Sequence, residues 1–170
     1  MVRTFNAKTP KLAPTAFVSE AAYVIGDVEI GENSSIWPGA VIRGDGSSIK
    51  IGNDSQIEDN CIVHTGRPMV IGDRVHIGHG AVIHCSRIGN NVLIGSNATI
   101  LDGAEIGDSC LIAANSLVSE GMKIPNDSFV AGVPAEAKGK ITPAQVARIE
   151  KGVKAYIKLA QEYKQQGLEG

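Results

Sequence analysis

Three of the four histidines in this chain have neighbours and a spacing that could build a metal site. His64 and His84 each follow a pair of β-branched residues, and His79 precedes His84 by five residues. Neutral imidazole is the commonest metal ligand in proteins. Three imidazoles leave zinc one free coordination position, which is typical of a catalytic site. His64, His79 and His84 are therefore the candidate ligands, if the fold brings them together.

A six-residue repeat determines where these histidines lie. From residue 18 to residue 130 an Ile or Val recurs every six residues, with a three-residue insertion, an addition of two residues and one deletion. The nineteen sites are Val18, Val24, Ile30, Ile36, Ile42, Ile51, Ile57, Val63, Ile71, Ile77, Ile83, Ile88, Ile94, Ile100, Ile106, Ile112, Val118, Ile124 and Val130.

The repeat predicts an all-β fold, a parallel β-helix in which three hexads form one triangular coil, with about six coils in all. Small side chains such as Ala22, Ala40 and Ala98 lie two positions before the aliphatic sites and should also point inward. Asn, Asp, Gly and Ser between the strands are typical of tight corners. An ordinary β-sandwich would not keep this period through nineteen steps.

The repeat stops after Pro134, which divides the chain into a β-helix domain (1–134) and a C-terminal linker with a helix (135–170). Thr142, Pro143 and Gln145 match a helix cap, a proline in the first turn and a capping-box partner. Apolar residues then recur at spacings of three and four, so the helix should pack on the β-helix or on a neighbouring subunit. They are Val146, Ile149, Val153, Tyr156, Ile157, Ala160 and Tyr163.

Composition excludes several classes of function. The net charge is −2 without a run of Lys or Arg, so nucleic acid is not an expected partner. No stretch approaches the roughly 18 apolar residues of a membrane span, and the N-terminus does not resemble a signal peptide. We therefore expect a cytoplasmic protein that does not contact membranes. Its three cysteines lack CxxC spacing, which argues against disulfides and a cysteine-based zinc site.

Stacking of the coils should bring two histidines together. Residues three hexads apart lie above one another, so Ile42, Val63 and Ile83 form a column. The residues that follow them, Arg43, His64 and His84, should then be about 4.8 Å apart. Tetrahedral zinc needs ligand nitrogens about 3.3 Å from one another, which a stacked histidine pair can reach.

His79 belongs to a different column, two positions after Ile77. Five residues across a corner span up to about 16 Å, so one ion could hardly collect His79 and His84 from the same subunit. If all three share an ion, His79 comes from a neighbour, which predicts a homotrimer with metal at its interfaces. The same geometry sets Asp59 of one subunit opposite Arg43 of the next.

For several of these residues a purely structural role is the alternative to a role in the site. Arg43, Asp45 and Asp59 could serve only as interface ion pairs. His76 lies at a different offset and is expected to be an ordinary surface histidine. Cys85, beside His84, is expected to be a core residue, although contact with the metal is a second option.

The constellation Arg43-Gly44-Asp45, Gln56-Ile57-Glu58-Asp59-Asn60, His64, His79 and His84 resembles the gamma-class carbonic anhydrases. The resemblance covers nearly the whole chain and implies a left-handed β-helix. It makes His64 and His84 metal ligands from one subunit and His79 a ligand from the next. It matches Arg43, Asp45 and Asp59 to the interface arginine and acids, and it loosely places Tyr156 near the metal pocket.

Two departures from the family pattern matter. Glu58 replaces a glutamine of the common Asn-x-Gln-Asp motif, and the short segment Thr65-Gly66-Arg67-Pro68 replaces an acidic loop that carries a proton-shuttle glutamate in the prototype. We expect Glu58 to relay a proton and Gln56 to orient the attacking group.

The resemblance implies a lyase that hydrates carbon dioxide to bicarbonate. Zinc lowers the pKa of a water molecule to about 7 and so prepares it for this attack. Ferrous iron and cobalt suit three imidazoles as well.

Two alternatives are a coenzyme A-dependent acyltransferase on the same scaffold and a non-catalytic or weakly active metal-binding accessory protein. Loss of activity on chelation would favour the anhydrase over the transferase.

Overall fold

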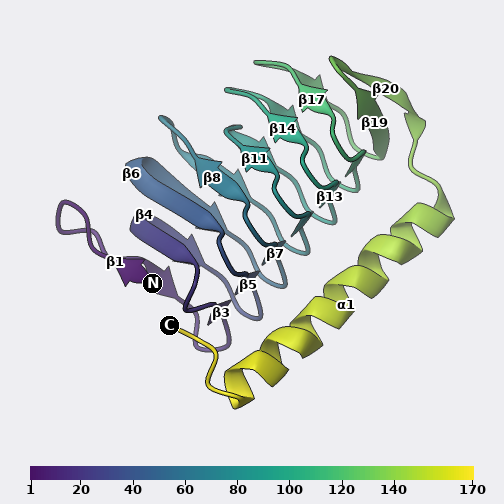
Figure 1. Cartoon of the computed structure of the whole chain (residues 1–170). Coiled ribbons are helices and arrows are strands. Elements are labelled where there is room, and N and C mark those ends of the chain that lie inside the picture. The colour runs from purple at the N-terminus through teal and green to yellow at the C-terminus, as the bar shows by residue number, and fades with distance from the viewer.

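The chain winds into a parallel β-helix of about seven turns, with one long helix along its side (Figure 1). This architecture comes from a computed structural model that describes residues 1–170. The predicted β-helix of hexapeptide repeats is confirmed. The number of turns exceeds the expected six because β1 (Val2–Arg3) and β2 (Lys11–Leu12) both pair with β4 (Tyr23–Ile30), so the stack begins before the first hexad.

The aliphatic repeat forms the core. All nineteen predicted sites are buried, none is more than 4% exposed, and all belong to one continuous cluster. The small residues two positions earlier, such as Ala40, Ala81 and Ala98, are buried in the same cluster. β-Branched side chains fill this narrow interior because they pack well on a pleated surface.

The coils present three faces, each built from one strand per turn. The first face is formed by the first residues of β4 and β6 (Val41–Ile51), followed by β8 (Ile62–His64), β11 (Val82–Ile83), β14 (Thr99–Ile100) and β17 (Leu117–Val118). The second is formed by the last residues of β4 and β6 with β9 (Met69–Ile71), β12 (Arg87–Ile88), β15 (Glu105–Ile106) and β18 (Lys123–Ile124).

The third face is a separate sheet, whose strands stack in the order of the chain. It consists of β3 (Phe17–Val18), β5 (Ser35–Ile36), β7 (Gln56–Ile57), β10 (His76–Ile77), β13 (Leu93–Ile94), β16 (Leu111–Ile112), β19 (Ser128–Gly132) and β20 (Ala135–Lys140). The strand β20 pairs antiparallel with β19, so the expected linker begins as part of the sheet.

The residue before each buried aliphatic site points outward and gives each face its own chemistry. The second face carries a charged column in which Glu29 pairs with Lys11 and Lys50, and Glu105 pairs with Lys123. The first face carries a mostly apolar column. Its members are Tyr23, Val41, Ile62, Val82, Thr99 and Leu117.

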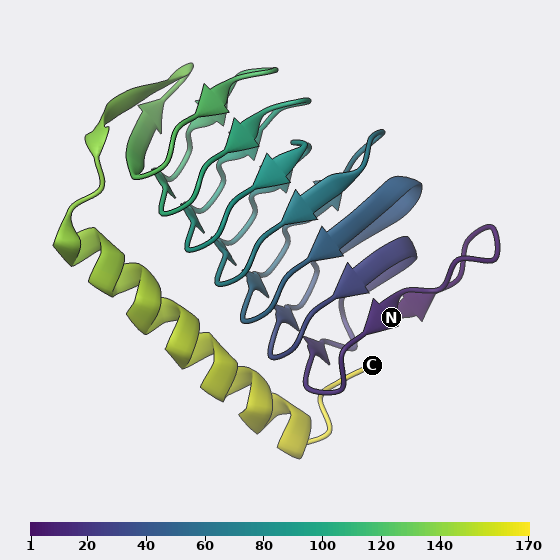
Figure 2. The ribbon, with the colours of Figure 1, turned by 180° about the vertical axis from the view of Figure 1, so that it is seen from behind.

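The helix α1 (Pro143–Gln165) covers part of the third face. It begins beside the last coils and runs back toward the first, so the two chain ends lie at the same end of the molecule (Figure 2). The predicted Thr142 cap and its capping box with Gln145 are confirmed. Ile149, Val153 and Ala160 of the predicted apolar stripe are buried.

An aromatic cluster ties the C-terminal half of the helix to the early coils. Tyr163 packs edge-on against Phe17 and Trp37, and Tyr156 packs edge-on against Trp37 with ring centroids 5.3 Å apart. The helix therefore has a fixed position over β3 and β5. The helix does not combine the length and the apolar character needed to cross a membrane.

Most corners turn through left-handed backbone three positions after an aliphatic site. In one column Asn60, Asn97 and Asn115 have φ values of 58–59°, and Gly39 and Gly80 occupy the same position on other coils. A Cβ atom on Gly39 would lie 2.3 Å from Asn60 Oδ1, so a side chain there would require the Asn60 side chain to move. Asn tolerates this conformation better than most other residues, which explains the corner composition.

A second corner column forms a ladder of side-chain oxygens. Each Oδ1 accepts a hydrogen bond from a backbone N–H on the preceding coil, over distances of 2.7 to 2.9 Å. The acceptors are Asn53, Asp73, Asn90, Asp108 and Asn126. The ladder satisfies backbone donors that the short strands do not pair.

We expect Asp73→Ala to lower the free energy of unfolding by about 1 kcal/mol, because the N–H of Asn53 loses its acceptor. Asp73→Asn keeps an oxygen at the same place and should stay close to the wild type. Denaturant unfolding followed by circular dichroism measures both. Equal destabilisation by the two substitutions would contradict this role.

The three cysteines are expected to be unreactive in the folded protein. Cys61, Cys85 and Cys110 are buried and free, and burial raises the pKa of Cys61 and of Cys85 to about 12. Since the thiolate is the reactive form, a thiol reagent at pH 8 should label none of them before denaturation and all three afterwards. Rapid native labelling of Cys85 would show instead that this side chain reaches the surface beside His84.

Candidate metal centre

The stacked column predicted from the repeat is present and brings two histidines together. Arg43 pairs with His64 in neighbouring strands, and Val63 pairs with Ile83, which places His84 directly above His64. His64 Nδ1 and His84 Nε2 lie 3.0 Å apart. This separation is close to the about 3.3 Å between two nitrogens on a tetrahedral zinc ion. The donor pair therefore fits one transition-metal ion.

His79 lies elsewhere in the same chain. It follows β10, at the corner between the third and first faces, and its side chain is 56% exposed. Its Nδ1 donates to Asp59 Oδ2 at 2.9 Å. No group of three His, Cys, Asp or Glu side chains in the chain surrounds a common point that could hold a metal ion. A single chain thus presents the imidazoles of His64 and His84 as a pair, and the imidazole of His79 lies at a separate corner.

Each of the three candidate ligands has a carboxylate against a ring nitrogen. Asp45 Oδ1 lies 3.3 Å from His64 Nε2, and Asp59 is bound to His79. His84 Nδ1 donates to Asp102 Oδ1 at 2.7 Å. Carboxylates in this position orient metal-binding histidines and select the tautomer that leaves the other nitrogen free, as in His84. The second nitrogen of His79, Nε2, lies 3.1 Å from Glu58 Oε2.

Asp102 was not among the predicted site residues. It follows β14, the strand that pairs with β11, and so lies one coil beyond His84. The column rule could have found it, because Ile83 and Ile100 are direct partners and Asp102 comes two positions after Ile100. The contact itself depends on how the His84 ring turns, which the repeat does not specify.

The surroundings of His64 favour its neutral form. Burial lowers the pKa of the imidazole, and the positive charge of Arg43 lowers it further, against the opposing effect of Asp45. Neutral imidazole is the form that binds metals. Arg43 donates to Asp45 Oδ2 at 2.6 Å, so the arginine and the acid form an ion pair within one chain.

Two buried oxygens among the predicted site residues have no hydrogen-bond partner in the chain. They are Asp45 Oδ1, which faces His64 without hydrogen-bond alignment, and Gln56 Oε1. The other end of the Gln56 amide donates to the backbone oxygen of Asp54 at 2.6 Å. Buried polar atoms are usually paired, so both oxygens are available to a group from outside the chain.

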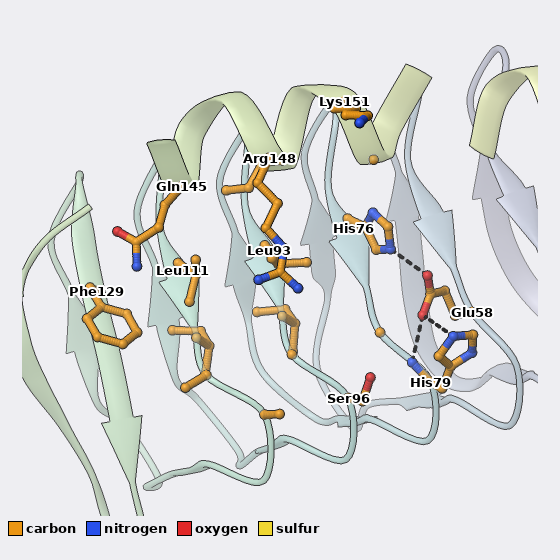
Figure 3. Close-up of a pocket in the computed structure, with 18 of the residues that line it drawn as sticks. Glu58, His76, His79, Leu93, Ser96, Leu111, Phe129, Gln145, Arg148 and Lys151 are labelled. Carbon is orange, nitrogen blue, oxygen red and sulfur yellow. Dashed lines mark hydrogen bonds and ion pairs between the residues drawn. The ribbon is translucent and has the colours of Figure 1, made fainter. Parts of the chain in front are cut away.

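Glu58 is buried at the centre of a second cluster, close to His79. His76 Nε2 donates to Glu58 Oε1 at 2.5 Å, while the backbone N–H of His79 donates to Glu58 Oε2 at 2.9 Å (Figure 3). Burial alone would raise the pKa of Glu58. Hydrogen bonds from His76 and Tyr156 outweigh that effect and leave the pKa below its usual value, so the group is a carboxylate.

The expectation that His76 is an ordinary surface histidine was wrong. Its side chain is only 12% exposed, binds Glu58 and packs edge-on against Tyr156 with ring centroids 4.9 Å apart. The reason is tertiary, since His76 points outward from the third face and the helix α1 covers that point. Tyr156 reaches the same carboxylate, and burial followed by Glu58 raises the pKa of its hydroxyl.

The predicted site residues therefore fall into two clusters within one chain. Arg43, Asp45, His64 and His84 gather on the first face, together with Asp102. Glu58, Asp59, His79 and Tyr156 gather around the corner beside the third face, with Gln56 one coil earlier and His76 added.

Cys85 does not belong to either cluster. It is 1% exposed and lies in the hydrophobic core.

The comparisons with known proteins agree with the repeat and with the family resemblance. The family model described as bacterial transferase hexapeptide (six repeats) matches residues 85–120. The crystal structure of a putative acetyltransferase from Bacillus cereus is similar with a TM-score of 0.95 and 38% identity, over 98% of both chains. That likeness extends the match from the repeat to the C-terminal helix.

Two curated relatives indicate a more specific family. The chain is 52% identical over 146 residues to a probable carbonic anhydrase from Methanocaldococcus jannaschii, covering 85% of this chain and 92% of that protein. It is 40% identical over 162 residues to the mitochondrial gamma carbonic anhydrase 2 of Arabidopsis thaliana, covering 91% of this chain and 58% of that longer protein. The chain belongs to the gamma-class carbonic anhydrase family of hexapeptide-repeat proteins.

Proposed function

We propose that this protein catalyses the reversible hydration of carbon dioxide to bicarbonate, at metal centres shared between the subunits of a homotrimer. The observation that carries the proposal is the 3.0 Å approach of His64 Nδ1 to His84 Nε2, in a chain of the carbonic anhydrase family. The His64 and His84 pair of one subunit and His79 of the next would hold the ion. Zinc is the metal we propose, and ferrous iron and cobalt suit the same ligands.

When bound, the metal would supply an acidified water molecule that is nucleophilic near neutral pH. The protein positions the imidazoles that would bind the metal. Hydrogen bonds to Asp59 and Asp102 orient His79 and His84, and Asp45 Oδ1 lies 3.3 Å from His64 Nε2. The proton relay through Glu58 and the orienting role of Gln56 stay predictions, as does a role for Tyr156 beyond its contact with Glu58.

The first face supports the trimer. Tyr23, Ile62 and Val82 are 36–37% exposed, in one column on the face that carries His64 and His84. Contiguous exposed apolar side chains mark protein interfaces. A contact between this face and the His79 corner of a second copy joins two different surfaces, and such contacts close into a ring when the rotation allows it. We also propose that Arg43 of one subunit then faces Asp59 of the next.

An acyltransferase is the second candidate, because the similar structure from Bacillus cereus is titled a putative acetyltransferase. A coenzyme A-dependent transfer would need one catalytic histidine as a base and would not be sensitive to chelation. A third candidate is a metal-bound accessory protein whose site is slow. Stopped-flow hydration assays and acetyl-coenzyme A consumption, each with and without a chelator, separate the three.

We expect the zinc-loaded protein to accelerate carbon dioxide hydration and to lose this activity on chelation. His84→Ala should bind zinc weakly and reduce the rate to that of the uncatalysed reaction, because two imidazoles no longer converge. Metal content and stopped-flow rates measure these effects. A zinc-loaded wild type without hydration activity would reject the anhydrase in favour of the accessory protein.

A site shared between two subunits predicts that two inactive variants can complement each other. His79→Ala and His84→Ala chains are each inactive, but a trimer assembled from both has some sites with all three histidines. Random assembly of a one-to-one mixture should restore about a quarter of the wild-type activity, since each intact site needs the right chain on both sides. No recovery after joint refolding would contradict a site between subunits. The separately refolded variants are the control.

Asp102 provides a test of the carboxylate contacts. Asp102→Ala should weaken zinc binding about 10–100-fold, the usual effect of removing such a partner. Glu120→Ala is a matched control, because Glu120 occupies the equivalent position one coil further and contacts no histidine. Chelator competition gives both dissociation constants. Wild-type affinity in Asp102→Ala would show that this contact does not support the metal.

A further inference from the structure

The helix and the third face enclose a groove that begins at Glu58 and His79 and extends away from them along the third face. α1 packs on β3, β5 and β10, whereas a cavity of about 750 Å³ lies between α1 and the strands β10, β13, β16 and β19. Ligand pockets in proteins are commonly about 300–1,000 Å³. Carbon dioxide and bicarbonate have only three or four heavy atoms, so most of this volume is available to a larger molecule.

The floor of the groove is an apolar column. Leu93, Leu111 and Phe129 are direct partners on three successive coils, and all three point outward beneath the helix (Figure 3). Two coil steps span about 9.5 Å. That is roughly the length of an extended alkyl chain of eight carbons, given carbon–carbon bonds of about 1.5 Å. The floor of the groove therefore matches a linear alkyl chain in length and polarity.

The helix side of the groove is cationic. Arg148 and Lys151 both line it, and neither takes part in any of the ion pairs of the chain. Figure 3 shows the Arg148 side chain reaching from α1 toward Leu93. The acid at the end of the groove, Glu58, is already bound by His76 and by the backbone of His79. An unpaired guanidinium above an apolar floor is complementary to a carboxylate that carries an aliphatic chain.

We propose that this groove binds a medium-chain aliphatic carboxylate, with its carboxylate on Arg148 and its chain along Leu93, Leu111 and Phe129. Glu58, His76 and His79 line one end of the groove, whereas His64 and His84 do not line it. Binding needs neither the metal nor carbon dioxide, so the proposal is independent of the proposed hydration activity.

Isothermal titration calorimetry of the full chain with octanoate tests the proposal. Octanoate should bind saturably, and each methylene added between butyrate and octanoate should strengthen binding a few-fold, about the effect of burying one more methylene. Arg148→Gln should weaken octanoate binding about tenfold, the loss expected for one charge-assisted hydrogen bond. Lys154→Gln, on the same helix but outside the groove, should bind as the wild type does.

Three results would overturn the proposal. The first is the absence of saturable octanoate binding up to about 10 mM, a range that covers millimolar dissociation constants. The second is an affinity that does not depend on the chain length of the carboxylate. The third is an unchanged affinity for octanoate in Arg148→Gln. If octanoate does not bind and Arg148→Gln shifts the assembly state in sedimentation, a neighbouring copy occupies the groove instead. Because binding is measured directly, none of these results depends on whether the protein hydrates carbon dioxide.

Discussion

The parallel backbone hydrogen bonds between successive coils hold the molecule in vertical register. Ile42, Val63 and Ile83 are direct partners in neighbouring strands, so the positions that follow them stack in the same order. Parallel strands lie about 4.8 Å apart, which lets two imidazoles of one column approach a shared ion. Insertions do not disturb this register, because the strands on either side pair again, as Ile51 does with Ile71. The approach of His64 to His84 is thus a consequence of strand pairing rather than of a specialised loop.

The same register divides the surface into three chemically different faces. Each strand contributes one outward-facing side chain to its face, and these side chains stack in a column. A preference for charged or for apolar residues at that position therefore gives the whole column one chemical character. The charged column of the second face pairs with itself and suits contact with water, whereas the third face is partly covered by α1. The first face carries exposed apolar side chains beside His64 and His84. A face of this kind gains stability by being covered, which is consistent with the proposed assembly.

Carboxylates organise the histidines on both sides of the expected interface. Asp102 binds His84 on the first face and Asp45 lies beside His64, while Asp59 and Glu58 hold His79 at its corner. Glu58 is buried and ionised, and donors from His76, Tyr156 and the His79 backbone compensate for its burial. A charge in such a place is stable only with these partners. The helix that supplies Tyr156 is therefore part of the support for the candidate site, although it carries none of the metal ligands.

The sequence by itself determined the β-helix, its nineteen core positions, the helix cap and the column that joins His64 to His84. The β-helix, its core positions and the histidine column depend on a fixed period along the chain, which can be counted without coordinates. The helix cap depends on the local motif of Thr142, Pro143 and Gln145. The tertiary structure alone decided the environment of His76, the contact between His84 and Asp102, and the groove above Leu93, Leu111 and Phe129. These features depend on where α1 lies over the third face and on how individual rings turn. The position of the helix and the orientation of a ring produce no periodic pattern in the sequence, because they depend on packing between segments that are distant along the chain.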